Sequence, residues 1–185
     1  MILAILMVIA AGIFRLAAHG FHWWNIAPVG AMALLGGMCL GRRYALWVPL
    51  AVLAVTDVLL NVWMSYPVIY WPRAFDYGAF LLIGLLGLWT RDRKLGSKIG
   101  AVLATPFLFF LISNFAVWLF GMSLANMPYD KTFTGLMNCY AAGLPFLQGT
   151  VIGDWGFMAL FAVSALALRR ASSERTRWLV AEARA

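Results

Sequence analysis

The chain has 185 residues, of which 64% are hydrophobic and 11% are charged. Soluble proteins carry charge on about a quarter of their residues, so this composition excludes an ordinary soluble domain and indicates an integral membrane protein. The formal net charge of +7 would suggest a nucleic acid partner for a soluble protein. Here the basic residues flank apolar runs and act as topology signals, and we exclude nucleic acid as a partner.

Six apolar runs follow one another along the chain, and we expect each of them to span the lipid bilayer as a helix of about 20 residues. The first three runs cover residues 1–18, 26–41 and 44–64. The second run carries Ala33, Gly37 and Gly41 at four-residue spacing. Such a stripe of small residues allows the backbone of another helix to approach closely.

The last three runs cover residues 77–89, residues 98–121 and a segment that begins near Pro145 and ends at Arg169 and Arg170. The connections after the third and fifth runs are long and rich in Tyr, Trp, Pro and Asn, and long ordered loops usually have a function. We therefore expect residues 1–170 to form one six-helix transmembrane domain, followed by a basic cytoplasmic tail at residues 171–185.

The positions of Lys and Arg predict the orientation. Eleven of the 14 basic residues follow the second, fourth or sixth run or lie in the tail, whereas Arg15, Arg73 and Lys131 lie on the other face. Because basic residues concentrate in cytoplasmic loops, we expect both termini inside the cell. The predicted fold class is an all-α membrane protein with six transmembrane helices, N-in and C-in.

The strongly polar residues of these runs gather in one half of the bilayer. With a rise of about 1.5 Å per residue, all of them fall in the outer half. They are Asn25, Asp57, Asn61, Asn114, Gln148 and Asp154. A pore or a proton pathway would need polar groups across the full thickness. The asymmetry therefore predicts a water-accessible cavity that opens outward and is closed toward the cytoplasm.

One helix face of the fifth run is the predicted wall of this cavity. Asn114 and Trp118 are four residues apart, which places them on the same face. We expect Asn114, Trp118 and Asp57 to line one ligand pocket, with Asn25, Tyr140 and Gln148 near its mouth. Asn61 and Asp154 are further candidate ligand-binding residues. The alternatives are a helix-to-helix hydrogen bond for Asn114 and an interfacial aromatic belt for the aromatic residues.

Asp57 and Asp154 need an explanation, because an isolated carboxylate at this depth costs about 2.5 to 3.5 kcal/mol on insertion scales. Each could pair with Arg15, stay protonated or face a ligand. Arg15 is the only basic residue that we expect within reach on the outer half. We therefore predict that it neutralises one of the two aspartates.

Catalytic and metal-binding motifs are missing from the sequence. There is no His-Glu-x-x-His, Gly-x-Ser-x-Gly or glycine-rich phosphate loop. His19 and His22 have the spacing of a metal-binding pair but no obvious third ligand, and interfacial capping is their more common role. We expect neither enzymatic activity, nor a cofactor, nor a bound metal.

Several segments resemble an uncharacterised family of small bacterial membrane proteins with six spans. They are Asn25-Ile-Ala-Pro28-Val-Gly30-Ala31, Asp57, Asn114-Phe-Ala-Val-Trp118, Cys139-Tyr140 with Pro145-Phe146, and Gly153-Asp154. The resemblance covers about residues 25 to 165. That family is itself similar in fold to the substrate-binding S-components of energy-coupling-factor (ECF) vitamin importers.

The resemblance implies that the chain captures a small, vitamin-like and ring-containing molecule at the outer face of a bacterial cytoplasmic membrane. It also implies docking onto an ECF coupling subunit with two ATPases, although the chain could work alone. The rival hypothesis is a non-catalytic accessory or assembly subunit of a larger membrane complex, whose buried polar residues join helices. A sensor that does not transport is a third possibility.

Overall fold

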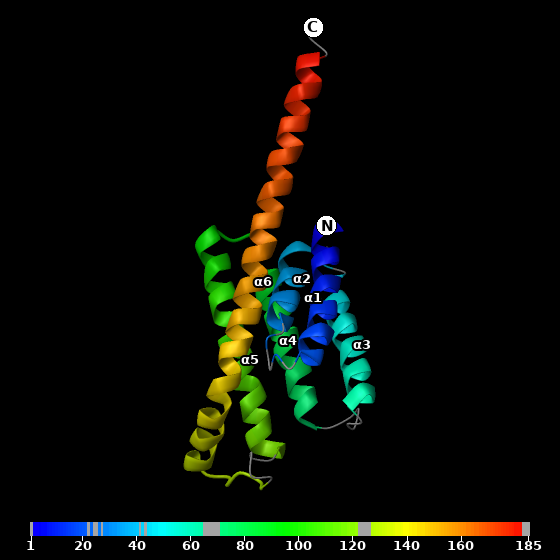
Figure 1. The fold of residues 1–185 in the computed structure, drawn as a ribbon. Coiled ribbons are helices and arrows are strands. Elements are labelled where there is room, and N and C mark those ends of the chain that lie inside the picture. The colour runs from blue at the N-terminus through cyan, green and yellow to red at the C-terminus, as the bar shows by residue number, and fades with distance from the viewer. Residues whose placement is uncertain are drawn as a thin grey trace.

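The computed structural model describes residues 2–21, 23, 26, 28–40, 42, 44–64, 71–121 and 127–182, and within these residues every regular element is a helix. The helices are α1 (Ile2–Gly20), α2 (Val29–Cys39), α3 (Trp47–Met64), α4 (Trp71–Thr90), α5 (Leu95–Phe120) and α6 (Phe133–Glu182). Figure 1 shows them as one bundle with both chain termini toward the same end. The all-helical prediction is confirmed.

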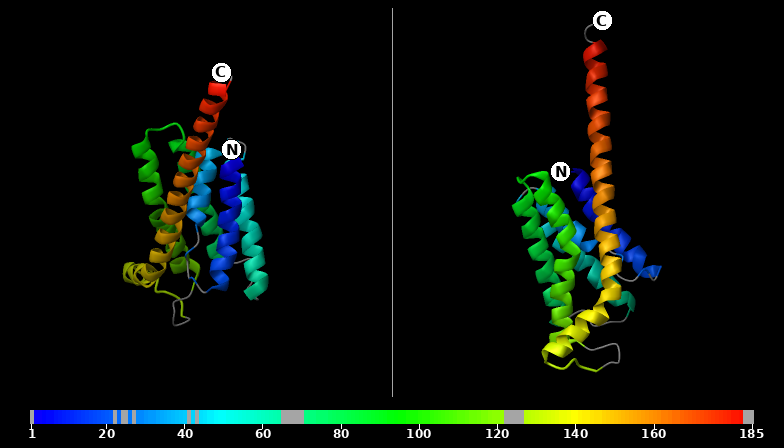
Figure 2. Two further views of the ribbon diagram at one scale, coloured as in Figure 1. Left: turned by 45° about the horizontal axis from the view of Figure 1, so that its top comes forward. Right: turned by 90° about the vertical axis from the view of Figure 1, so that its left-hand side faces the viewer.

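Several predicted boundaries are wrong. The fourth helix begins at Trp71, about six residues before the predicted start, so part of the predicted outer loop is helical. The sixth helix begins at Phe133, well before Pro145, which lies inside it. A proline in a membrane helix is tolerated where neighbouring groups satisfy the freed carbonyl. Figure 2 shows α6 bending in its yellow section before it continues past the bundle as a long straight helix.

The C-terminal part of α6 extends the helix through the predicted domain boundary at residue 170, and Glu182 is its last residue. By length and composition, α5 and the segment Phe133–Leu168 of α6 are apolar and long enough to cross a membrane. Among the described residues, the apolar stretches in α1, α2 and α3 are shorter: Ile5–Gly20, Val29–Cys39 and Trp47–Trp63. Six spans therefore stay a prediction.

Helix α2 lies at the centre of the bundle. Its eleven residues include no charged side chain, and eight of them, from Gly30 to Gly37, are buried. A side-chain carbon at Gly37 would overlap the backbone of α4, and one at Gly87 of α4 would overlap that of α2. The predicted close approach at Gly37 is thus confirmed, and α4 is the partner helix.

Side chains from α6 and from the turn after α4 cap the two ends of α2. Its N-cap residue, Pro28, provides no side-chain hydrogen bond. Instead, the Asp154 carboxylate of α6 accepts a hydrogen bond from the backbone N–H of Ala31, with 2.8 Å between Oδ1 and N. At the other end, the Arg91 guanidinium donates to the carbonyl oxygens of Gly37, at 2.6 Å from Nη2, and of Leu40. An anion at the N-terminus and a cation at the C-terminus both complement the helix dipole.

Candidate functional site

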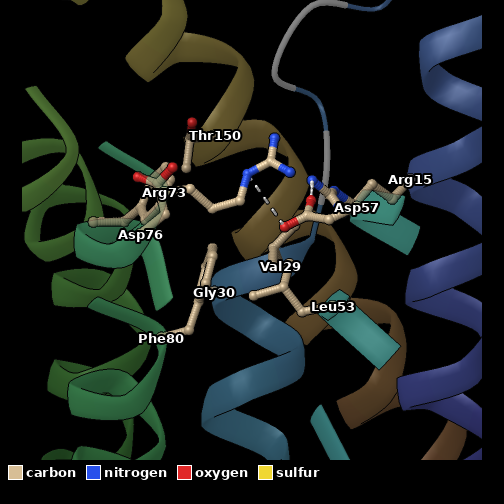
Figure 3. Close-up of a pocket in the computed structure, with 10 residues that line it drawn as sticks. Arg15, Val29, Gly30, Leu53, Asp57, Arg73, Asp76, Phe80 and Thr150 are labelled. Atoms are coloured by element: carbon tan, nitrogen blue, oxygen red, sulfur yellow. Dashed lines mark hydrogen bonds and ion pairs between the residues drawn. The ribbon is translucent and has the colours of Figure 1, made fainter. Parts of the chain in front are cut away.

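A cavity of about 220 Å³ lies where all six helices meet. Each helix contributes lining residues, which are Arg15, Val29, Gly30, Leu53, Asp57, Arg73, Asp76, Phe80, Phe109 and Thr150. Figure 3 draws these residues as sticks and labels all of them except Phe109. Arg15 lies near the end of α1, Gly30 near the start of α2 and Arg73 near the start of α4. The cavity is therefore in the half of the bundle opposite the chain termini.

An ionic cluster forms one side of this cavity. Asp57 of α3 accepts a hydrogen bond from the Arg15 guanidinium of α1 and forms an ion pair with it. The same guanidinium donates to the Thr56 hydroxyl, with 2.7 Å between Nη1 and Oγ1. On the other side of the carboxylate, Arg73 Nε of α4 lies 3.9 Å from Asp57 Oδ2. Asp57 thus links three helices, and the predicted pairing of Arg15 with an aspartate is confirmed.

Asn61 supports the same cluster from one turn further along α3. Its side-chain oxygen lies 3.2 Å from Arg73 Nη2 and accepts a hydrogen bond from it. Because Arg73 contacts both Asp57 and Asn61, these two residues share a helix face, as their four-residue spacing predicts. Asn61 is buried, and its amide nitrogen has no hydrogen-bond partner in the part of the chain that the structure describes.

The opposite side of the cavity combines a carboxylate with aromatic rings. Asp76 and Phe80 are four residues apart on α4 and so share a face. The Phe80 ring stacks on Phe109 of α5, with 4.9 Å between ring centroids and an interplanar angle of 18°. In Figure 3 the Arg73 guanidinium points toward Asp57 and away from the Asp76 carboxyl group. The cavity therefore has one side of paired charges and one side with a flat apolar surface beside a carboxylate.

Asp154 lies outside this cavity and is fully buried. Its Oδ1 atom caps α2, while its Oδ2 atom has no hydrogen-bond partner among the described residues. A side-chain carbon at Gly30 would overlap both the Asp154 carboxylate and the methyl group of Thr105. Only glycine therefore fits at position 30. Asp154 acts on the cavity indirectly, because it fixes the end of α2 that carries Val29 and Gly30.

Asn114, Trp118 and Tyr140 are not among the residues that line the cavity. The Asn114 amide donates to the Phe110 carbonyl of its own helix at 2.9 Å, and its side chain fills the space beside Gly143 of α6. The Tyr140 hydroxyl donates to the Leu111 carbonyl at 2.9 Å. The Tyr140 hydrogen bond and the packing of Asn114 beside Gly143 connect α5 with α6. The Asn114 hydrogen bond itself stays within α5, so it is not the helix-to-helix hydrogen bond of the alternative interpretation.

The remaining predicted residues lie elsewhere. Trp118 donates from Nε1 to the Asp130 carbonyl at 2.9 Å, in the connection between α5 and α6. Gln148 is exposed, and Asn25 falls outside the described residues, as does His22. Among the predicted ligand-binding residues that the structure describes, Asp57 lines this cavity and Asn61 contacts the lining residue Arg73, whereas the others do not line it. Ligand binding by any of them stays a prediction.

Two lining residues, Arg73 and Asp76, were missed by sequence reasoning. The expectation that Arg15 is the only basic residue near the aspartates is wrong, because Arg73 also faces Asp57. Both missed residues fall in a segment predicted as an outer loop, but they lie in the first turns of α4. Their three-residue spacing, which puts both on one helix face, was the available signal. Among the described residues, no three His, Cys, Asp or Glu side chains gather as a metal site would require.

Comparison with known proteins identifies a family. A family model described as "Family of unknown function (DUF6580)" matches residues 1–176. The chain therefore belongs to this family, in agreement with the predicted membership of an uncharacterised family. No curated protein and no solved structure matches the chain.

Proposed function

We propose that this member of the DUF6580 family is a multi-pass membrane protein that binds a small, ring-containing molecule at the outer membrane face for uptake, in the manner of an ECF S-component. The observation that supports this most directly is a cavity of about 220 Å³ that four residues with ionisable side chains line inside a largely apolar bundle. Charged groups within membrane segments are costly and are usually retained for function.

The proposed orientation places the bundle in a bacterial cytoplasmic membrane with both termini in the cytoplasm. Basic residues in the α2–α3 and α4–α5 connections and near the C-terminus support it, because such residues mark cytoplasmic ends. In this orientation the cavity belongs to the outer half of the bilayer. A solute would enter from outside, and the apolar packing of α2 against α4 would close the path to the cytoplasm.

The proposed partners are a small-molecule ligand, the lipid bilayer and an energising membrane complex such as a coupling subunit with two ATPases. Catalysis, a cofactor and nucleic acid are not part of the proposal. The Arg15, Asp57 and Arg73 cluster has the geometry of a binding site, because its charges are fixed by hydrogen bonds from three helices. A preorganised polar wall lowers the entropy cost of holding a ligand.

The rival function, an accessory subunit of a larger membrane complex, is favoured by one observation. Asn114, which sequence reasoning assigned to ligand binding, packs beside Gly143 at the contact between α5 and α6. In this alternative the ionic cluster likewise only joins helices. Copurification separates the two functions, because ATPase subunits would accompany an importer, whereas other membrane subunits would accompany an assembly factor.

A direct test of ligand capture compares small molecules that remain bound through purification. Val29→Phe should fill the cavity, whereas Val55→Phe places the same ring on the exposed face of α3. We expect mass spectrometry of extracts to find a compound with the wild type and with Val55→Phe, but not with Val29→Phe. A compound that remains with both variants, or none with any protein, would contradict the proposed function.

A further inference from the structure

The four charges in the cavity are not equally engaged. Arg15 is bonded to Asp57 and Thr56, and Arg73 contacts Asp57 and Asn61. Asp57 is thus shared between two guanidinium groups. For the half-buried Asp76, no hydrogen bond or ion pair with another described residue is found, and Arg73 and Arg15 act on its carboxylate only through longer-range electrostatic attraction. Asp76 therefore retains the capacity of a carboxylate to accept several hydrogen bonds.

The surface next to Asp76 suits a flat ring. Phe80, one turn along α4, and Phe109 of α5 form a stacked pair at the cavity wall. Aromatic faces attract cations, because the ring quadrupole places negative charge above and below the ring plane. The cavity volume of about 220 Å³ equals the space of roughly seven water molecules at ~30 Å³ each, enough for a single-ring compound.

We propose that the cavity binds a small organic cation with one flat ring, whose N–H groups donate to Asp76 and whose ring lies against Phe80 and Phe109. This inference rests on the proposed capture function and adds the class of ligand. An anion would instead have to displace Asp57 from Arg15 or Arg73, and it would lie beside the Asp76 carboxylate. A cation can pair with the Asp76 carboxylate without breaking the contacts of Asp57 with Arg15 and Arg73, so the geometry favours a cation over an anion.

Three compounds of nearly the same shape test the charge preference. Benzamidine, benzamide and benzoate carry a cationic, a neutral and an anionic group on the same ring. We expect isothermal titration of the full-length protein in nanodiscs to give at least tenfold tighter binding of benzamidine than of the other two. Asp76→Asn should weaken benzamidine binding at least tenfold, because the amide replaces a charged acceptor.

The control variant is Asp92→Asn, at the exposed turn between α4 and α5, which should leave the affinity for benzamidine unchanged within twofold. Thermal unfolding of each variant without ligand verifies that it is folded. Benzamidine binding that persists in a folded Asp76→Asn protein would overturn the proposal.

The other outcomes separate this inference from the proposed function. If benzoate bound more tightly than the other two compounds and the Arg73→Gln variant lost this binding, the proposal of a cationic ligand would be overturned. The proposed capture of a small molecule would stand. The proposal of a cationic ring ligand would also be overturned if none of the three compounds bound, while the wild type still retained a molecule through purification that the Val29→Phe variant lost. If no ring compound bound and no molecule were retained, both proposals would be refuted.

Discussion

The ion pair between Arg15 and Asp57 gives the sharpest prediction about stability. The two side chains are only 20% and 9% exposed, so water screens the pair weakly. Removing one partner of such a pair leaves an uncompensated charge, and the usual cost is about 3 to 5 kcal/mol. Because Arg73 also faces Asp57 and compensates part of its charge, we expect Arg15→Leu to cost roughly 2 to 4 kcal/mol of unfolding free energy.

A double-mutant cycle isolates the interaction. We expect the double variant Arg15→Leu/Asp57→Asn to lose about 1 to 2 kcal/mol less unfolding free energy than the sum of the losses in the two single variants. The recovery is partial, because Arg73 then loses its carboxylate partner. Reversible unfolding in mixed micelles with increasing SDS measures each free energy.

The control for this cycle is Arg93→Leu, which removes an exposed guanidinium that lies 4.8 Å from the centroid of the Trp89 ring. Its cost should stay near or below about 1 kcal/mol. If the losses of unfolding free energy in the two single variants add up to that of the double variant within about 0.5 kcal/mol, Arg15 and Asp57 do not depend on each other. That result would refute the reasoning on the ionic cluster.

Three further predictions concern helix contacts and use the same unfolding assay. Gly30→Ala should cost about 1 to 3 kcal/mol by overpacking against Asp154. Gly100→Ala should cost nothing or stabilise α5, because a side-chain carbon there has open space. Equal effects of the two substitutions would refute the close packing at Gly30. Asp154→Ala should destabilise by about 1 kcal/mol more than Asp154→Asn, because asparagine keeps an acceptor for the α2 cap; the reverse order would exclude the capping role. Gly143→Leu should separate α5 from α6 at Asn114 and cost about 1 to 3 kcal/mol; a cost close to zero would show that the two helices do not meet there.

Composition and periodicity were sufficient to predict the helices. The apolar runs identified six helices and the small-residue stripe on α2, because hydrophobic patterns report directly on local structure. The errors concerned the starts of α4 and α6 and the end of α6. Residues 71–76 and 133–144 mix aromatic and polar groups, which look like loop segments in a sequence but form the first turns of α4 and α6.

The candidate site was predicted only in part. Asp57 and Arg15 could be paired from their depth, but depth along a helix does not report which way a face points. Asn114 has the depth of Asp57 and yet faces Gly143. Asp76 and Arg73 became recognisable as lining residues only once α4 was placed against α3, since that arrangement is set by contacts between residues far apart in the sequence.

The central claim, a cavity that receives a solute from outside the cell, is tested most directly by cysteine accessibility. In a chain in which serine replaces Cys39 and Cys139, Thr150→Cys places a thiol in the cavity, Ser97→Cys marks the proposed cytoplasmic face and Asn126→Cys the outer one. An impermeant thiol reagent added to intact cells should label position 126 rapidly and position 150 slowly, and position 97 only after permeabilisation. Labelling of position 97 in intact cells, with position 150 protected, would contradict the account.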